Sequence, residues 1–292
     1  MEEKVLYVKL PENAQYRRVK ITEDGIGIVY SEDNMSKTRK EIIMTRTQIP
    51  KPRPLIGAKK VYQKEDVPYW YCRIKNGRDE LMQVYMEDLK EEDLLYDFKT
   101  GKERKFLSSK LKKFKENVLI AIANKPREGY RWIPVFEPSL DGKNRLQFVK
   151  GKIPLTGLDI YEWKEKISEY SPENESQFAS KNTYFLLLLR WLKDGFASLE
   201  QLAMHSEEIG HFKDSENAKN NYERTGERKF GGLYGFAGNT RKIVISEGLS
   251  AGYLSIGGMY SIPGNVYSLS TVDTIDSYYV VGRTSLALIE LI

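Results

Sequence analysis

The stretch GGLYGFAGNTRKIV, Gly231 to Val244, places four glycines in front of a short basic and apolar run. Glycine lets the backbone take positive φ or pass close to a neighbouring strand. Asn239 tolerates the left-handed region while its side chain bonds local backbone. The stretch therefore predicts a sharply turning, closely packed connection that leads into a strand. Two ordinary turns between strands are the alternative interpretation.

Two helices are predicted before this stretch. NTYFLLLLRWLK, Asn182 to Lys193, is apolar over most of its circumference, which indicates a helix inside the core that ends at Gly195. In SLEQLAMHSEEIG, Ser198 stands three residues before Gln201, a capping-box arrangement for a second, short helix. Beyond Gly210, repeated glycines and the runs KIVI, YLSI and TSLALIELI predict compact β-structure with many loops.

The first half of the chain has the pattern of a β-rich region. VLYVKL, YRRVKI and GIGIVYS are separated by turn-forming residues, and Asn76-Gly77 between two apolar runs predicts a tight hairpin. YRWIPVFEPS and NRLQFVKG, joined by LDGK, are further strand candidates, and the segment from 37 to 57 is expected to be a loop. The fold class is therefore α+β, with a β-rich domain at 1–151 and a second domain at 152–292.

A basic amphipathic helix is predicted at about 102–124. From Lys102 to Lys115 the chain holds seven basic residues and one acid, Glu103, and apolar residues recur at helical spacing. The basic residues are Lys102, Arg104, Lys105, Lys110, Lys112, Lys113 and Lys115. A solvated helix face is the commoner role of such a segment, so nucleic acid is not expected as a partner. Binding to nucleic acid or to another anionic surface remains an alternative.

Composition limits the class of protein. Of 292 residues, 46 are basic and 41 acidic, and this mild excess does not imply nucleic-acid binding. The single cysteine, Cys72, cannot form an internal disulfide, which predicts a reducing compartment. We expect no membrane insertion, because no apolar run approaches the roughly 18 residues that span a bilayer. The N-terminus does not resemble a secretory signal peptide.

The order of three C-terminal landmarks resembles a known family. GLYGFAGNTRKIV (232–244), SIGGMY and SLALIELI follow one another as the "GLYDMxGNVWEW", "RGGSW" and closing-strand segments do in the formylglycine-generating enzymes, or sulfatase-modifying-factor domains. The resemblance covers about 180–292 and is good only over 232–261. It implies a C-type-lectin-like domain with two helices and short twisted strands. The residues that carry the motif are Gly232, Tyr234, Gly238, Asn239, Gly257 and Gly258.

The same resemblance argues against the family's chemistry. Those enzymes depend on a pair of cysteines that bind copper, whereas Cys72 stands alone and outside the matching region. Lys242 occupies the position of an acid that helps the family hold calcium. His205 and His211 are too few and badly spaced for zinc, and Asp273 with Asp276 are expected to be solvated rather than an acid–base pair. We therefore expect no catalytic residue, metal or cofactor.

A lectin-like domain without catalytic groups is a scaffold for binding loops. The candidate ligand-binding residues lie in the last loops: Tyr253, Tyr260, Asn265, Tyr267, Tyr278 and Tyr279. The combination also resembles phage tropism determinants, which predicts a phage or prophage virion component, such as a tail-fibre or host-attachment protein. It would assemble in the host cytoplasm, form a homo-oligomer and bind a surface receptor or other virion proteins. The alternative is a cytoplasmic interaction or regulatory factor.

Overall fold

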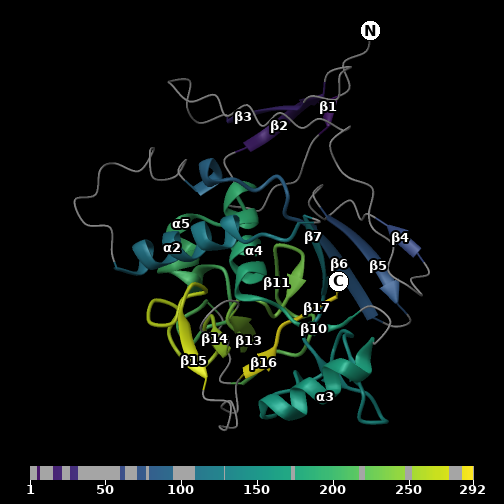
Figure 1. Ribbon diagram of the computed structural model, residues 1–292. Coiled ribbons are helices and arrows are strands. Elements are labelled where there is room, and N and C mark those ends of the chain that lie inside the picture. Colours follow the sequence, from purple (N-terminus) through teal and green to yellow (C-terminus); the bar gives the residue numbers. More distant parts are fainter. Residues whose placement is uncertain are drawn as a thin grey trace. The chain divides into compact units, whose positions relative to one another are not determined.

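Two compact units make up the chain in the computed structural model, Met1–Arg53 and Pro54–Ile292. The structure describes residues 5–6, 16–21, 27–31, 60–62, 71–76, 79–94, 109–127, 129–171, 175–216, 221–246, 252–275 and 285–291 (Figure 1). The predicted boundary at 151/152 lies inside the second unit. The predicted loop at 37–57 lies outside the described residues.

The first unit contains a three-stranded antiparallel sheet. Its strands are β1 (Val5–Leu6), β2 (Tyr16–Ile21) and β3 (Gly27–Ser31), in that order, with β2 in the centre. Val19 of β2 pairs with Val29 of β3, and the register shifts near the start of β2. The three strands predicted from VLYVKL, YRRVKI and GIGIVYS are confirmed.

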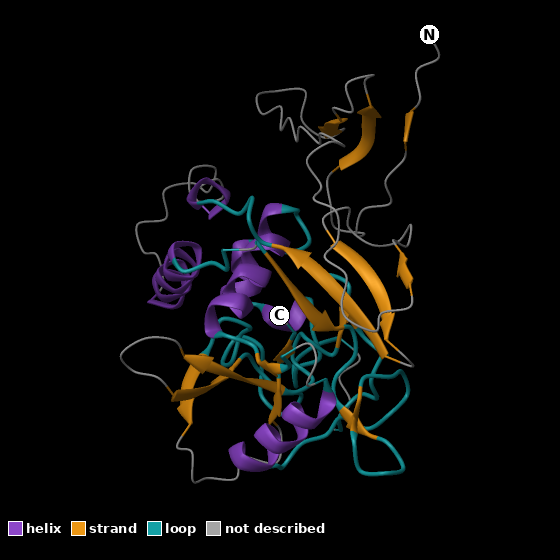
Figure 2. Cartoon of the chain, turned by 45° about the vertical axis from the view of Figure 1, so that its right-hand side comes forward, coloured by secondary structure: helices purple, strands orange, loops and turns teal. Residues whose placement is uncertain are grey.

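The second unit opens with a four-stranded antiparallel sheet. Its order is β4 (Lys60–Tyr62), β5 (Tyr71–Asn76), β6 (Asp79–Tyr85) and β7 (Tyr130–Pro134) (Figure 1). Figure 2 draws the strands in orange. Asn76 pairs with Asp79 across the predicted hairpin, which confirms it. A bridge between Trp132 and Leu291 joins the edge of this sheet to the end of the chain.

The helices predicted at about 102–124, at Asn182 to Lys193 and after Ser198 correspond to α2 (Ser109–Ala123), α4 (Lys181–Lys193) and α5 (Leu199–Ala203). The described residues also include α3 (Ile160–Tyr170) and the short 3-10 helix η3 (Ser206–Glu208). Both bonds of the capping box between Ser198 and Gln201 are present, and Gly195 takes φ 74° just after α4. Residues 102–108 of the predicted basic helix lie outside the described residues.

Short strands complete the C-terminal part and confirm an α+β fold. One sheet has the order β15 (Val272–Ile275), β14 (Gly252–Ile256), β13 (Arg241–Ser246) and β16 (Ser285–Ala287), in which β13 and β16 are parallel. The second unit also contains three two-stranded antiparallel pairs. They are β8 (Ser139–Leu140) with β9 (Leu146–Gln147), β10 (Gln177–Phe178) with β17 (Ile289–Glu290), and β11 (Lys229–Phe230) with β12 (Leu233–Tyr234).

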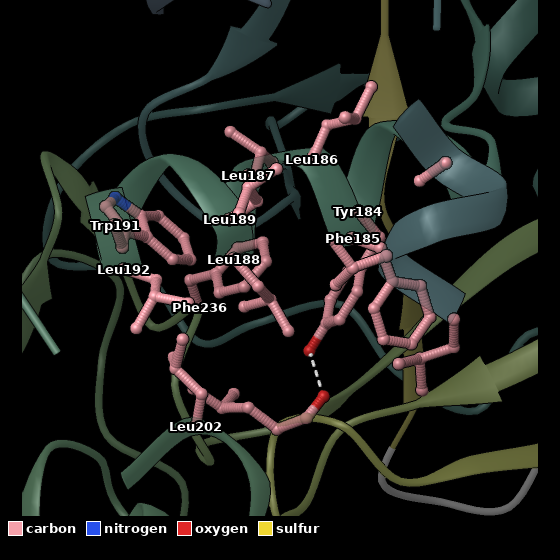
Figure 3. Packing of buried hydrophobic residues seen from close by; sticks show 14 of the residues in the cluster. Tyr184, Phe185, Leu186, Leu187, Leu188, Leu189, Trp191, Leu192, Leu202 and Phe236 are labelled. Atoms are coloured by element: carbon pink, nitrogen blue, oxygen red, sulfur yellow. Dashed lines mark hydrogen bonds between the residues drawn. The ribbon is translucent and has the colours of Figure 1, made fainter. Parts of the chain in front are cut away.

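One hydrophobic core joins the two halves of the second unit. Every residue of α4 from Asn182 to Leu192 is buried, and the same core includes Val84 of β6 and Phe114 of α2. Figure 3 shows how the α4 side chains pack, with the Tyr184 hydroxyl bonded to the Leu269 carbonyl at 2.8 Å. Segments before and after position 151 therefore depend on each other for their burial.

Candidate functional site

The glycine-rich stretch closes around a buried carboxylate, Glu137, which follows β7. The carboxylate accepts hydrogen bonds from Asn239 Nδ2 at 2.8 Å and Thr240 Oγ1 at 2.9 Å, and Lys242 Nζ lies 3.3 Å away. Glu137 is 4% exposed and Lys242 is 2% exposed. The stretch is therefore folded around an ion pair inside the protein.

Two glycines of the stretch show why side chains are excluded there. Gly235 takes φ 65°, and a Cβ at this position would overlap the Glu137 carboxylate. Gly238 takes φ 86°, and its Cβ would meet the ring of Phe212 and the carbonyl of His211. Both positions need the left-handed backbone and the missing side chain together.

Lys242 places its ammonium group among oxygen atoms. Besides the Glu137 carboxylate, Nζ contacts the Gly235 carbonyl, the Thr240 carbonyl and the Thr240 hydroxyl, each at 2.8 Å. Burial raises the pKa of Glu137, while the Lys242 charge and the hydrogen bonds from Asn239 and Thr240 act in the opposite direction. The Lys242 ammonium group thus fills a buried position that is lined by oxygen atoms.

A second buried group adjoins the first. His211 is fully buried and its Nδ1 lies 3.5 Å from Glu223 Oε1, while Arg228 reaches the same oxygen at 3.4 Å. Since a carbonyl only accepts, His211 Nε2 donates to Asn221 O at 3.0 Å. Asn239 Oδ1 accepts from the Glu223 backbone N–H at 2.8 Å, which links this group to Glu137. The sequence analysis considered His211 only as a zinc ligand, and no local pattern indicates its contacts with Glu223 and Asn221.

A cavity next to the ion pair is very small. It has a volume of about 20 Å³ and is lined by residues that include Phe136, Glu137, Tyr234 and Lys242. A space of this size holds about one water molecule.

The predicted ligand-binding residues fall into two places. Tyr253 lies on β14, with its ring against Phe178 at a centroid distance of 5.2 Å. Lys164 Nζ lies 5.3 Å from the Tyr253 ring and 5.7 Å from that of Tyr161, which is 58% exposed on α3. Tyr253 thus belongs to a surface that it shares with α3.

The others that the structure describes lie in the loop between β14 and β15. Tyr260 stacks on His211 at 6.2 Å between ring centroids and meets the edge of Tyr222 at 4.7 Å. The Tyr267 ring lies under the Arg241 guanidinium at 5.0 Å, and Asn265 is exposed. Tyr278 and Tyr279 lie outside the described residues.

This loop is fixed to the core at several points. The Ser206 hydroxyl accepts from the Leu269 N–H at 2.9 Å, and Asp214 accepts from the Gly264 N–H at 2.7 Å. Together with the bond from Tyr184 to Leu269, these contacts tie the loop backbone to the core. We call residues 258–271 the fixed loop.

The predicted motif residues lie around this loop and the ion pair. Gly232 and Gly257 take φ 93° and 81°, and Tyr234 stacks on Phe136 at 4.9 Å. A Cβ on Gly258 would overlap Phe212, the ring that also limits Gly238. The first two landmarks of the sequence therefore pack against one aromatic side chain.

The predicted basic helix touches the fixed loop. Lys110 Nζ of α2 donates to the carbonyl of Asn265 and, at 3.4 Å, to that of Val266. The sequence placed these elements in different domains, and no local pattern indicates that they meet. Asp273, one of the two acids set aside as solvated, pairs with Arg241 at 2.7 Å.

The described residues hold neither a cluster of metal ligands nor a helix suited to cross a membrane. Within the described ranges, three or more histidine, cysteine, aspartate or glutamate side chains do not gather as metal ligands would. No helix in the described part has the length and apolar character required to cross a bilayer. Comparisons with protein-family models, curated proteins and solved structures give no match.

Proposed function

We propose that the chain is a non-enzymatic binding protein whose fixed loop contacts a receptor. The observation that carries this proposal is that Tyr260 and Tyr267 are braced by His211 and Arg241 while Asn265 and Val266 beside them are exposed. Tyrosine offers rigid contact area at low entropic cost, and a preorganised surface loses less freedom on binding.

The finer fold belongs to this proposal. A C-type-lectin-like arrangement of residues 152–292 is supported by the order of α4, α5 and the glycine-rich stretch, and by the shared packing of Gly238 and Gly258 on Phe212. The setting that we propose is a phage or prophage particle, where the protein acts in host attachment and binds a surface glycan or protein.

The test uses the full chain with whole bacterial cells and a glycan array as probes. Replacing both exposed loop residues, Asn265→Ala with Val266→Ala, is expected to weaken retention by at least about tenfold, as the loss of contacts near the centre of an interface does. Ile153→Ala is the matched control, because Ile153 is also exposed, at 66%, and lies outside the fixed loop.

Two results would contradict the proposal. One is retention that the double variant leaves unchanged. The other is a protein that binds neither cells nor glycans, is missing from purified phage particles and copurifies with a cytoplasmic protein, which would favour an interaction or regulatory factor.

A further inference from the structure

The buried histidine His211 begins a segment that lies along the fixed loop. The Tyr260 ring of the loop stacks on the His211 ring, with 14° between the ring planes. The residues that follow His211 contact the loop as well: the Phe212 ring lies against Gly258, the Lys213 N–H donates to the Ile262 carbonyl, and Asp214 accepts from the Gly264 N–H. A displacement of His211 is therefore transmitted to the loop through a continuous set of contacts.

Both ring nitrogens of His211 face oxygen atoms. Nε2 donates to the Asn221 carbonyl at 3.0 Å, and Nδ1 lies 3.5 Å from Glu223 Oε1. Within the described residues, neither Nδ1 nor Glu223 Oε2 takes part in a hydrogen bond, although both atoms are buried. With a single ring proton on Nε2, Nδ1 would turn a lone pair toward the carboxylate. A second proton, on Nδ1, converts this contact into a charge-assisted one.

The Glu223 carboxylate is fixed by groups other than His211. Its backbone N–H donates to Asn239 Oδ1 at 2.8 Å, and its carbonyl accepts from Asn239 Nδ2 at 3.1 Å. Arg228 lies 3.4 Å from the same carboxylate oxygen that faces His211. Among the described residues, the charged or titratable side chains that face His211 are thus Glu223, Arg228 and Tyr260, and Tyr222 lies at the edge of Tyr260.

We propose that His211 is a pH-sensitive positioning residue of the fixed loop. Its doubly protonated ring is held by Glu223 and supports Tyr260, and loss of the Nδ1 proton breaks the contact with Glu223. Because Asn239 anchors Glu223, the imidazole is the partner that moves, and Tyr260 moves with it. Histidine is the side chain whose charge ordinarily changes between about pH 5 and 8.

The direction of the effect follows from the ion pair. The Glu223 carboxylate favours the charged imidazole, so the contact is present at low pH and is lost as pH rises. For the receptor contact of the fixed loop, where this inference rests on the proposed function, the result is tighter binding at low pH than at high pH.

The test is a pH titration of the ¹⁵N-labelled full chain between about pH 5 and 9, a range that contains the ordinary histidine transition. We expect both His211 ring nitrogens to carry a proton at the acid end. As pH rises, loss of the Nδ1 proton should shift the Tyr260 amide signal along the same curve. A ring with one proton at the acid end, or with two protons throughout, would overturn the proposal. The spectra require no receptor, so this inference and the receptor contact can fail separately.

A charge-removing variant and a matched control complete the test. Glu223→Gln keeps the size of the side chain, and it should leave His211 with one ring proton and abolish the Tyr260 shift. His205→Gln is the control, because His205 is the other histidine of the chain and pairs with Glu207 at 3.2 Å. It should leave the Tyr260 curve unchanged. A curve that persists in Glu223→Gln, or disappears in His205→Gln, would contradict the proposal. The ring protons of the natural chain decide it even where Glu223→Gln does not fold.

Discussion

Burying Lys242 removes the hydration shell of an ammonium group, and the cost is offset by oxygen atoms of Gly235, Thr240 and Glu137. This arrangement explains why glycine and asparagine stand at positions 235 and 239. Gly235 leaves room for the carboxylate, and Asn239 ties that carboxylate to the segment that holds Glu223. At this scale the glycine-rich stretch supports the neighbouring loops, and its Lys242 side chain points into the protein.

Removing one member of the Glu137–Lys242 pair should lower the free energy of unfolding more than removing both. Lys242→Met leaves the Glu137 carboxylate buried and uncompensated, so we expect a loss of about 3 to 5 kcal/mol in the free energy of unfolding. The double variant Glu137→Leu, Lys242→Met should lose less than Lys242→Met alone. Urea unfolding of the four members of this cycle measures the coupling. Additive losses would mean that the two side chains stabilise the fold independently.

At the scale of elements, the end of α4 is fixed to the segment after β6. Arg190, which is fully buried, pairs with Asp88, and Lys193 Nζ lies 3.4 Å from Asp88 and 3.5 Å from Asp93. Asp194 follows them as the C-cap of α4, and its Oδ2 is buried with no hydrogen-bond partner. Burial raises the pKa of Asp194 to about 7, against the opposing charges of Arg190 and Lys193.

The raised pKa of Asp194 determines how the stability of the fold changes with pH. Between about pH 4 and 7 the folded state holds a proton on Asp194 that the unfolded state releases, so stability falls as pH rises through this window. Asp194→Asn should remove that part of the dependence, which amounts to at most about 4 kcal/mol for a shift of about three units. Thermal unfolding at several pH values measures it.

Asp141 provides the control for this titration. Hydrogen bonds from Arg145 lower its pKa to about 2, so its ionisation lies below the window in question. Asp141→Asn should leave the change in the free energy of unfolding between pH 4 and 7 the same as in the natural chain. If Asp194→Asn also leaves that change intact, Asp194 does not titrate near neutrality.

At the scale of the molecule, patterns within a few residues predicted helices and turns correctly. Contacts between residues far apart in the sequence were not predicted. The capping box of Ser198 and Gln201 and the hairpin at Asn76-Gly77 depend on neighbours within a few residues, and both are present. Glu137 pairs with a lysine 105 positions later, and Lys110 reaches a loop 155 positions away. Spacing carries no signal for such pairs, because the tertiary fold alone brings them together.

The shared core connects the fixed loop to the first half of the second unit. Without residues 54–151, α4 would lose its contacts with α2 and β6, and Lys242 would lose Glu137. We therefore infer that the fixed loop depends on the whole unit from Pro54 to Ile292, because the residues that support it come from both segments.

The most direct test is the ¹H–¹⁵N correlation spectrum of a fragment comprising residues 152–292, compared with that of residues 54–292. We expect dispersed amide signals from the longer chain and the narrow dispersion of an unfolded or molten polypeptide from the shorter one. A dispersed spectrum of 152–292 whose signals coincide with those of the longer chain would contradict this account.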